Sequence, residues 1–101
     1  MRVFVIFDLP TLTSNERKDY RKFRQFLMKT GFIMMQESVY SKLCLNATAA
    51  KVVSENVKRH KPDNGLVELL IVTEKQYANI EYIVGNPGSE YIANTDRLVV
   101  L

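Results

Sequence analysis

The sequence predicts one α+β domain with the element order β-α-β-β-α-β, followed by an additional strand segment at the C-terminus. Three observations predict this class. A run of β-branched and aromatic residues at 3–7 precedes a capped amphipathic segment at 13–31. A second β-rich stretch at 32–43 precedes a second capped segment, and a third such stretch follows at 66–72. A length of 101 residues favours a single domain.

The first strand is predicted at 3–7, where Val3-Phe4-Val5-Ile6-Phe7 contains no polar residue. A run that is apolar on both faces is typical of a strand buried on both faces, so we expect it to be central in its sheet. Asp8 follows at the carboxyl end of this strand, and Leu9-Pro10 ends it because proline cannot donate to a sheet ladder.

The first helix is predicted between Thr13 and Gly31. Thr13 and Glu16 have the spacing of a capping box, and Gly31 stands where a C-terminal cap is expected. At 100° per residue, four apolar side chains fall within an arc of about 120°, and this face must pack on the sheet. They are Tyr20, Phe23, Phe26 and Leu27.

The stretch 32–43 is predicted to form two short strands with a bend near Glu37-Ser38. Asn46 then caps a second helix, and Pro62 ends it. The buried stripe of this helix is expected to consist of Ala50, Val53 and Val57, with His60 and Lys61 in its last turn. Residues 63–65 form a turn.

The strand expected at 66–72 completes the ferredoxin-like, or split βαβ, arrangement. It lies at a sheet edge in this topology, yet it contains one charge and no proline, so something should cover it. The tail can do this within the chain or across a dimer. We therefore divide the single domain 1–101 into a core, 1–73, and a C-terminal extension, 74–101.

Within the extension, residues 74–79 are expected to form a short turn or helix and residues 80–84 a strand. A turn at 86–88 and a further apolar strand at 97–101 are expected to follow.

Composition excludes several kinds of site. Cys44 is the only cysteine, so the chain has neither an intramolecular disulfide nor a cysteine-based zinc site, and His60 is the only histidine. No apolar run approaches the ~18 residues of a membrane helix, and the run at 3–7 is too short for a signal peptide. We therefore expect a cytoplasmic protein with no membrane partner.

The positive charge is concentrated in the first third of the chain. Residues 1–31 contain seven Lys or Arg and three acids, a net charge of +4, whereas residues 32–101 carry −1. The cations of the first helix span an arc of about 160° opposite the aromatic side chains. They are Arg17, Lys18, Arg21, Lys22, Arg24 and Lys29. A solvated face is one interpretation; the other is contact with the phosphates of a nucleic acid, without sequence preference.

Asp8 is the only carboxylate in a plausible chemical site. Magnesium prefers oxygen ligands and usually more than one protein carboxylate when it acts on phosphates. One Asp8 is inadequate alone, whereas two copies meeting across a dimer axis would suffice. The alternative is a strand-end residue that begins a turn before Leu9-Pro10.

The chain resembles the CRISPR-associated proteins of the second kind, the small proteins that accompany the integrase during spacer acquisition, most of all the type II-A version. The resemblance extends over essentially the whole chain. It is carried by Phe7-Asp8-Leu9-Pro10, by Tyr20-Arg21-Lys22-Phe23-Arg24, by Gly31 followed by Gln36-Glu37-Ser38-Val39-Tyr40, by Arg59-His60-Lys61-Pro62, by Val72-Thr73-Glu74-Lys75-Gln76 and by Arg97-Leu98-Val99-Val100-Leu101.

This resemblance implies a ferredoxin-like homodimer in which the C-terminal strand crosses to the partner's sheet. It implies a scaffold that bridges two integrase dimers beneath the middle of the incoming double-stranded DNA. Family members are also described as metal-dependent endonucleases acting on RNA or double-stranded DNA. The strand-end aspartate, here Asp8, is their magnesium ligand in each subunit.

The chain departs from the family pattern at Met34, where many members have an arginine two residues before Gln36. This departure argues against cleavage and leaves the scaffold role untouched. Our first hypothesis is therefore a DNA-binding adaptation scaffold. The second is a magnesium-dependent endoribonuclease or DNase with paired Asp8 residues, and the third is a generic ferredoxin-like dimerisation module.

Overall fold

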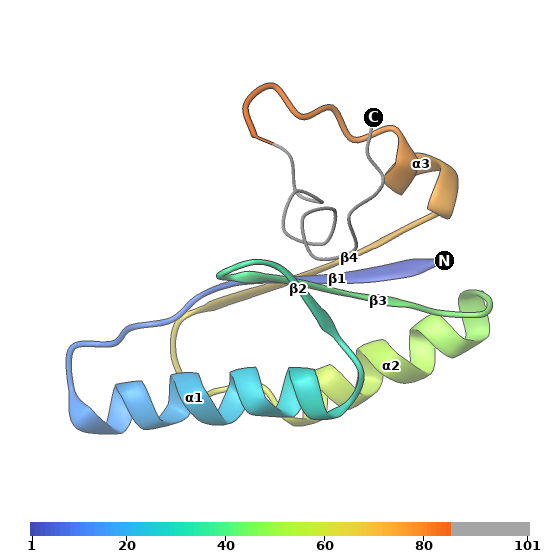
Figure 1. Cartoon of the computed structure of the whole chain (residues 1–101). Helices are drawn as coiled ribbons and strands as arrows, with labels where there is room; N and C mark the ends of the chain where they lie inside the picture. Colours follow the sequence, from blue (N-terminus) through green and yellow to red (C-terminus); the bar gives the residue numbers. More distant parts are fainter. Residues whose placement is uncertain (86–101) are drawn as a thin grey trace.

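The computed structural model describes residues 1–85 and confirms the predicted ferredoxin-like α+β fold (Figure 1). The elements are β1 (Arg2–Asp8), α1 (Ser14–Lys29), β2 (Ile33–Gln36), β3 (Val39–Leu43), α2 (Ala47–Arg59), β4 (Leu66–Val72) and α3 (Glu74–Ala78). The strands form one antiparallel sheet in the order β2-β3-β1-β4. Thus β1 is central and β4 is at an edge, as the sequence predicts.

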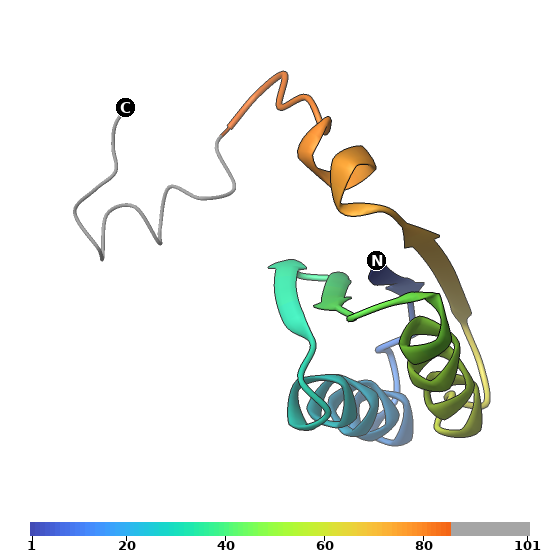
Figure 2. The ribbon, with the colours of Figure 1, turned by 90° about the vertical axis from the view of Figure 1, so that its right-hand side faces the viewer.

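The two long helices, α1 and α2, lie side by side on one face of the sheet, and α3 lies on the opposite side (Figures 1 and 2). We call the face under α1 and α2 the covered face and the other the open face. Side chains alternate between these faces along each strand. Within residues 1–85, no helix is long and apolar enough to cross a membrane.

The core lies between the covered face and the two helices. Val3, Val5 and Phe7 of β1 are almost fully buried there. The ring of Phe7 lies 5.3 Å from that of Phe23 on α1 and 5.7 Å from that of Tyr40 on β3. Aromatic pairs at these separations add to the stabilisation that comes from burial. These contacts fix α1 against the sheet.

The caps form where the sequence places them. The Thr13 side chain accepts from the backbone N–H of Glu16, whose carboxylate accepts from the backbone N–H of Thr13. Asn46 accepts from the N–H of Ala49 and so begins α2. Gly31 follows α1 with a φ of +98°, which a residue with a side chain rarely adopts.

Two expectations about strands are wrong. The first strand is not buried on both faces: Phe4 and Ile6, on the open face, are only partly buried. Residues 80–84 do not form a strand, because strand propensity needs a paired neighbour and no described strand pairs with them. The turn predicted at 86–88 and the strand predicted at 97–101 lie outside the described residues.

Candidate nucleic-acid interface and open sheet face

The basic face of α1, which we define as Arg17, Lys18, Arg21, Lys22, Arg24 and Lys29, lies away from the core, as its spacing predicts. Phe23 and Leu27 of the same helix are buried, whereas all the basic residues except Arg24 are exposed. A surface of one charge sign attracts counter-ions of the other sign. The helix therefore presents cations to solvent along its length.

Arg17 also holds the loop that precedes α1. Its Nη1 atom donates to the carbonyl oxygens of Thr11 and Leu12, at 3.2 and 2.9 Å. The guanidinium has five N–H donors, so these contacts leave others free. Arg17 thus both orders the entry to α1 and adds charge to the basic face.

Arg24 differs from the other basic residues because it also has a structural contact. Its Nε donates to the hydroxyl oxygen of Tyr40 at 2.8 Å, and the Tyr40 side chain is fully buried. This hydrogen bond raises the pKa of the Arg24 guanidinium above its usual value. A role for Arg24 in binding nucleic acid stays a prediction, and the fold already accounts for the position of its side chain.

Asp8 lies at the carboxyl end of β1, exposed, on the open face together with Phe4 and Ile6. The turn before β4 fixes the backbone beside it. A Cβ on Gly65, whose φ is +95°, would lie 2.9 Å from the Asp8 carbonyl oxygen and 2.7 Å from Leu9 Cδ2. The absence of a side chain at Gly65 therefore lets the two segments approach closely and so positions Asp8.

A single chain does not provide a complete set of ligands for a divalent cation. In the part of the chain that the structure describes, no group of three or more His, Cys, Asp and Glu side chains is close enough to hold a metal ion. Asp8 offers one carboxylate, fewer than the two that the paired-Asp8 hypothesis requires. The location of Asp8 on the open face is compatible with a second Asp8 from another copy.

The open face has exposed apolar side chains together with the charged residues Arg2, Asp8 and Glu68. Four residues there, from three strands, are more than half exposed: Ile33 at 51%, Leu43 at 58%, Leu66 at 56% and Leu70 at 54%. The strand registers place them on the side of Phe4 and Ile6. Large contiguous apolar surfaces on soluble proteins usually mark an interaction site. The edge strand β4 contributes two of these side chains.

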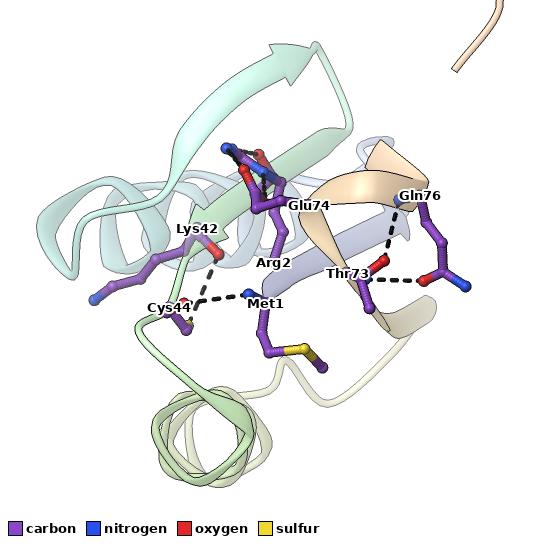
Figure 3. Close-up of polar contacts among 8 residues, drawn as sticks. Met1, Arg2, Lys42, Cys44, Thr73, Glu74 and Gln76 are labelled. Atoms are coloured by element: carbon purple, nitrogen blue, oxygen red, sulfur yellow. Dashed lines mark hydrogen bonds and ion pairs between the residues drawn. The ribbon is translucent and has the colours of Figure 1, made fainter. Parts of the chain in front are cut away.

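The short helix α3 covers one end of the open face through Arg2 (Figure 3). The guanidinium of Arg2 donates from Nε and Nη2 to the two carboxylate oxygens of Glu74, both at 2.9 Å. It also lies 4.0 Å from the ring centroid of Tyr77, whose ring is 5.8 Å from that of Phe4. This Arg2 clamp fixes the start of the C-terminal extension on the sheet.

The contact between Arg2 and Glu74 favours the charged form of each side chain. The hydrogen bond from Arg2 lowers the pKa of Glu74, and the same contact raises the pKa of Arg2. A capping box of Thr73 and Gln76 begins α3, also visible in Figure 3. Sequence reasoning missed this clamp, because residues 2 and 74 are distant in the chain.

The lone cysteine and histidine have structural surroundings in the part of the chain that the structure describes. Cys44 is buried in the core beside β3. His60 ends α2: its Nδ1 lies 2.9 Å from the Asn56 carbonyl oxygen, and its ring stacks on Phe26 with centroids 4.2 Å apart. Neither residue has the neighbours of a nucleophile or a general base.

These features define a ferredoxin-like α+β protein with one basic helical surface and one exposed apolar sheet face. The chain belongs to the family described as CRISPR associated protein Cas2, whose family model matches residues 1–80. This confirms the family that the motifs predict.

Similar proteins cover the full chain. A protein of Treponema denticola, named CRISPR-associated endoribonuclease Cas2, is 52% identical over 101 residues and covers all of both chains. A protein of Streptococcus mutans with the same name is 51% identical, over 100% of this chain and 93% of its own. The crystal structure of Streptococcus pyogenes Cas2 matches with a TM-score of 0.60 and 16% identity, covering 83% of this chain and 100% of that one, which shows the shared fold.

Proposed function

We propose that this protein is a homodimeric scaffold of CRISPR adaptation that binds double-stranded DNA without sequence preference and docks the CRISPR integrase. The observation that supports this most is the basic face of α1, in a chain that belongs to the Cas2 family. Cations on a regular helix contact phosphates, and phosphate contacts carry no sequence information.

The proposed dimer uses the open face. A second copy placed on Ile33, Leu66 and Leu70 would remove these side chains from water, which is favourable in proportion to the apolar area buried. The same arrangement keeps α1 and α2 of both copies on the outside (Figure 2). The C-terminal extension, which begins at α3, is our proposed surface for strand exchange or integrase docking.

Duplex binding is tested with the Lys18→Glu/Arg21→Glu variant, which changes two exposed residues without a structural contact. Fluorescence anisotropy with a labelled duplex should show loss of binding, and spacer integration should fail with it. The wild-type slope of log affinity against log salt should be several units, about 0.9 for each phosphate contact.

The matched control is Lys51→Glu/Lys58→Glu, which makes the same change of net charge at exposed positions on α2, away from α1. This control should bind nearly as the wild type does. Unchanged duplex binding by the α1 variant would refute the assignment of the basic face, and absence of binding by the wild type at low salt would favour the generic dimerisation module.

A second candidate function is a magnesium-dependent endonuclease acting on RNA or double-stranded DNA. It is supported by the position of Asp8 on the open face and by the names of the relatives, which are called endoribonucleases. Two Asp8 carboxylates from two copies would hold the ion. When bound, Mg²⁺ supplies charge stabilisation at the phosphate and activation of water. Asp8 itself would orient the phosphate through that site.

The nuclease is tested with Asp8→Asn on highly purified protein with Mg²⁺, using RNA and duplex DNA substrates. The candidate predicts that cleavage disappears, whereas Glu55→Gln, an exposed carboxylate on α2, retains it. Cleavage that persists in the Asp8 variant would assign it to a contaminant or another site. Normal integration by this variant would show that the scaffold does not need Asp8.

A further inference from the structure

A second group of cations adjoins the basic face of α1. A hollow of about 270 Å³ opens between the middle of α1 and the segment that ends α2. The helix α2 runs back beside α1 (Figures 1 and 2), and its C-terminal end contacts α1 through His60 and Phe26. The hollow is lined by Lys22, Arg59 and Lys61, by Asp19 and Asp63, and by Phe23, Phe26, His60 and Pro62.

An aromatic stack holds this hollow in shape. The rings of Phe26 and His60 are nearly parallel, at 13°, with centroids 4.2 Å apart. Because the carbonyl oxygen of Asn56 can only accept, Nδ1 of His60 donates to it at 2.9 Å. These two contacts tie the last turn of α2 to α1. The side chains of Arg59 and Lys61, on either side of His60, are therefore presented to the hollow from a fixed backbone.

The hollow has three Lys or Arg and two Asp in its lining, and no ion pair among the described residues joins them. Within residues 1–85, the two ion pairs are Arg2–Glu74 and Lys58–Glu55, so neither includes Lys22, Arg59 or Lys61. A preference for cations at a helix C-terminus accounts for Arg59 and Lys61 near the end of α2. It does not account for the convergence of Lys22 from the other helix.

We propose that this hollow is a second phosphate-contact site, which receives the sugar-phosphate backbone of the duplex bound by α1. The proposal rests on the proposed function, because it adds phosphate contacts at the end of α2 to those of α1. Lys22 belongs both to the basic face of α1 and to the hollow, so the two surfaces are continuous. Arg59 supplies a planar fork of donors that fits a phosphate, and Lys22 and Lys61 supply point charges.

The first test is Arg59→Gln/Lys61→Gln in the full-length protein, with duplex affinity measured across a salt series. Each lost phosphate contact should lower the salt slope by about 0.9, and affinity should fall equally for duplexes of unrelated sequence. The control Lys51→Gln/Lys58→Gln removes the same charge at exposed positions that do not line the hollow and should keep the wild-type slope. Thermal unfolding of each variant confirms that it folds.

The second test expects the opposite change, a gain in duplex affinity. Asp63 lines the hollow from the segment after α2 and repels a phosphate there, so Asp63→Asn should tighten duplex binding and leave the fold intact. The control Glu55→Gln removes the same negative charge at an exposed position that does not line the hollow, and it should give a smaller gain. Equal gains from the two variants would overturn the proposal.

Failure of this proposal and failure of the proposed function are distinguishable. If the wild type binds duplex, the Lys18/Arg21 variant loses binding and the Arg59/Lys61 variant matches its control, the hollow is not a phosphate site and the α1 assignment stands. If the wild type does not bind duplex at low salt, both proposals are wrong.

Discussion

The two faces of the sheet use the same strands in different ways. On the covered face, Val3, Val5 and Phe7 are buried against two helices. On the open face, the alternating residues Phe4 and Ile6 are only partly buried, and apolar neighbours on the outer strands are exposed. Thus one apolar run can form a core on one face of the sheet and leave apolar side chains exposed on the other, where we propose an interface.

The largest expected effect is on the covered face. Phe7→Ala should lower the free energy of unfolding by about 3–5 kcal/mol, because it leaves a cavity among buried aromatic rings. Leu70→Ala, on the open face, should change the free energy of unfolding of the monomer by only about 0.5 kcal/mol or less. Urea denaturation at low protein concentration measures both. Equal losses would refute the distinction between the faces.

Gly65 lies beside Asp8, at the end of the open face where Asp8 is exposed. Gly65→Ala should destabilise the protein by about 1–3 kcal/mol, because it strains a left-handed backbone position and pushes against Asp8 and Leu9. Chemical denaturation measures the loss. A matched control is Gly85→Ala, since a Cβ there meets nothing within 4 Å. Equal effects at the two glycines would show that the contact with Asp8 and Leu9 is unimportant.

Arg24 and Arg21 of α1 differ in their contacts, so their substitution should affect stability differently. Arg24→Gln should lower the melting temperature, because the hydroxyl of the buried Tyr40 loses the guanidinium donor. Arg21→Gln should leave the melting temperature unchanged, since Arg21 is exposed. Differential scanning calorimetry distinguishes them. If both variants melt as the wild type does, the Arg24–Tyr40 contact contributes nothing to stability.

The smallest expected effect concerns the Arg2 clamp and depends on pH. The pKa of Glu74 is lowered in the folded protein, so its stabilising contribution is present above the usual glutamate range and is lost as the pH falls through the lowered value. Arg2 stays charged over this whole range, and its hydrogen bond to Glu74 raises the pKa of the guanidinium further. The protection factors of the α3 amides, which remove the intrinsic pH dependence of exchange, should therefore fall on acidification, and Glu74→Gln should abolish this fall. Protection in Glu74→Gln that falls as in the wild type would exclude the clamp as its cause.

Much of the fold could be predicted because its signals are local. Thr13, Asn46 and the bend near Glu37-Ser38 act within a few residues, and each is found where the sequence places it. The strand predicted at 80–84 is wrong because apolar composition does not provide a pairing partner.

The candidate site was predictable only in part. Helical spacing separates the cations of α1 from its aromatic face, and this separation is confirmed. Spacing cannot show that Arg24 reaches Tyr40 or that Arg59 and Lys61 approach Lys22, because these neighbours are set by how the elements pack. Likewise, an apolar run such as 3–7 does not distinguish a core from an interface.

The central claim is that the open face receives a second copy of this chain, so that two basic helical surfaces act together. Sedimentation velocity of wild type, Leu70→Glu and Leu45→Glu tests it most directly. Leu70 lies on the open face and Leu45 is 92% exposed in the loop before α2. We predict that the wild type and Leu45→Glu sediment as dimers, and that Leu70→Glu is a folded monomer. A dimeric Leu70→Glu, or a monomeric wild type, would contradict the account.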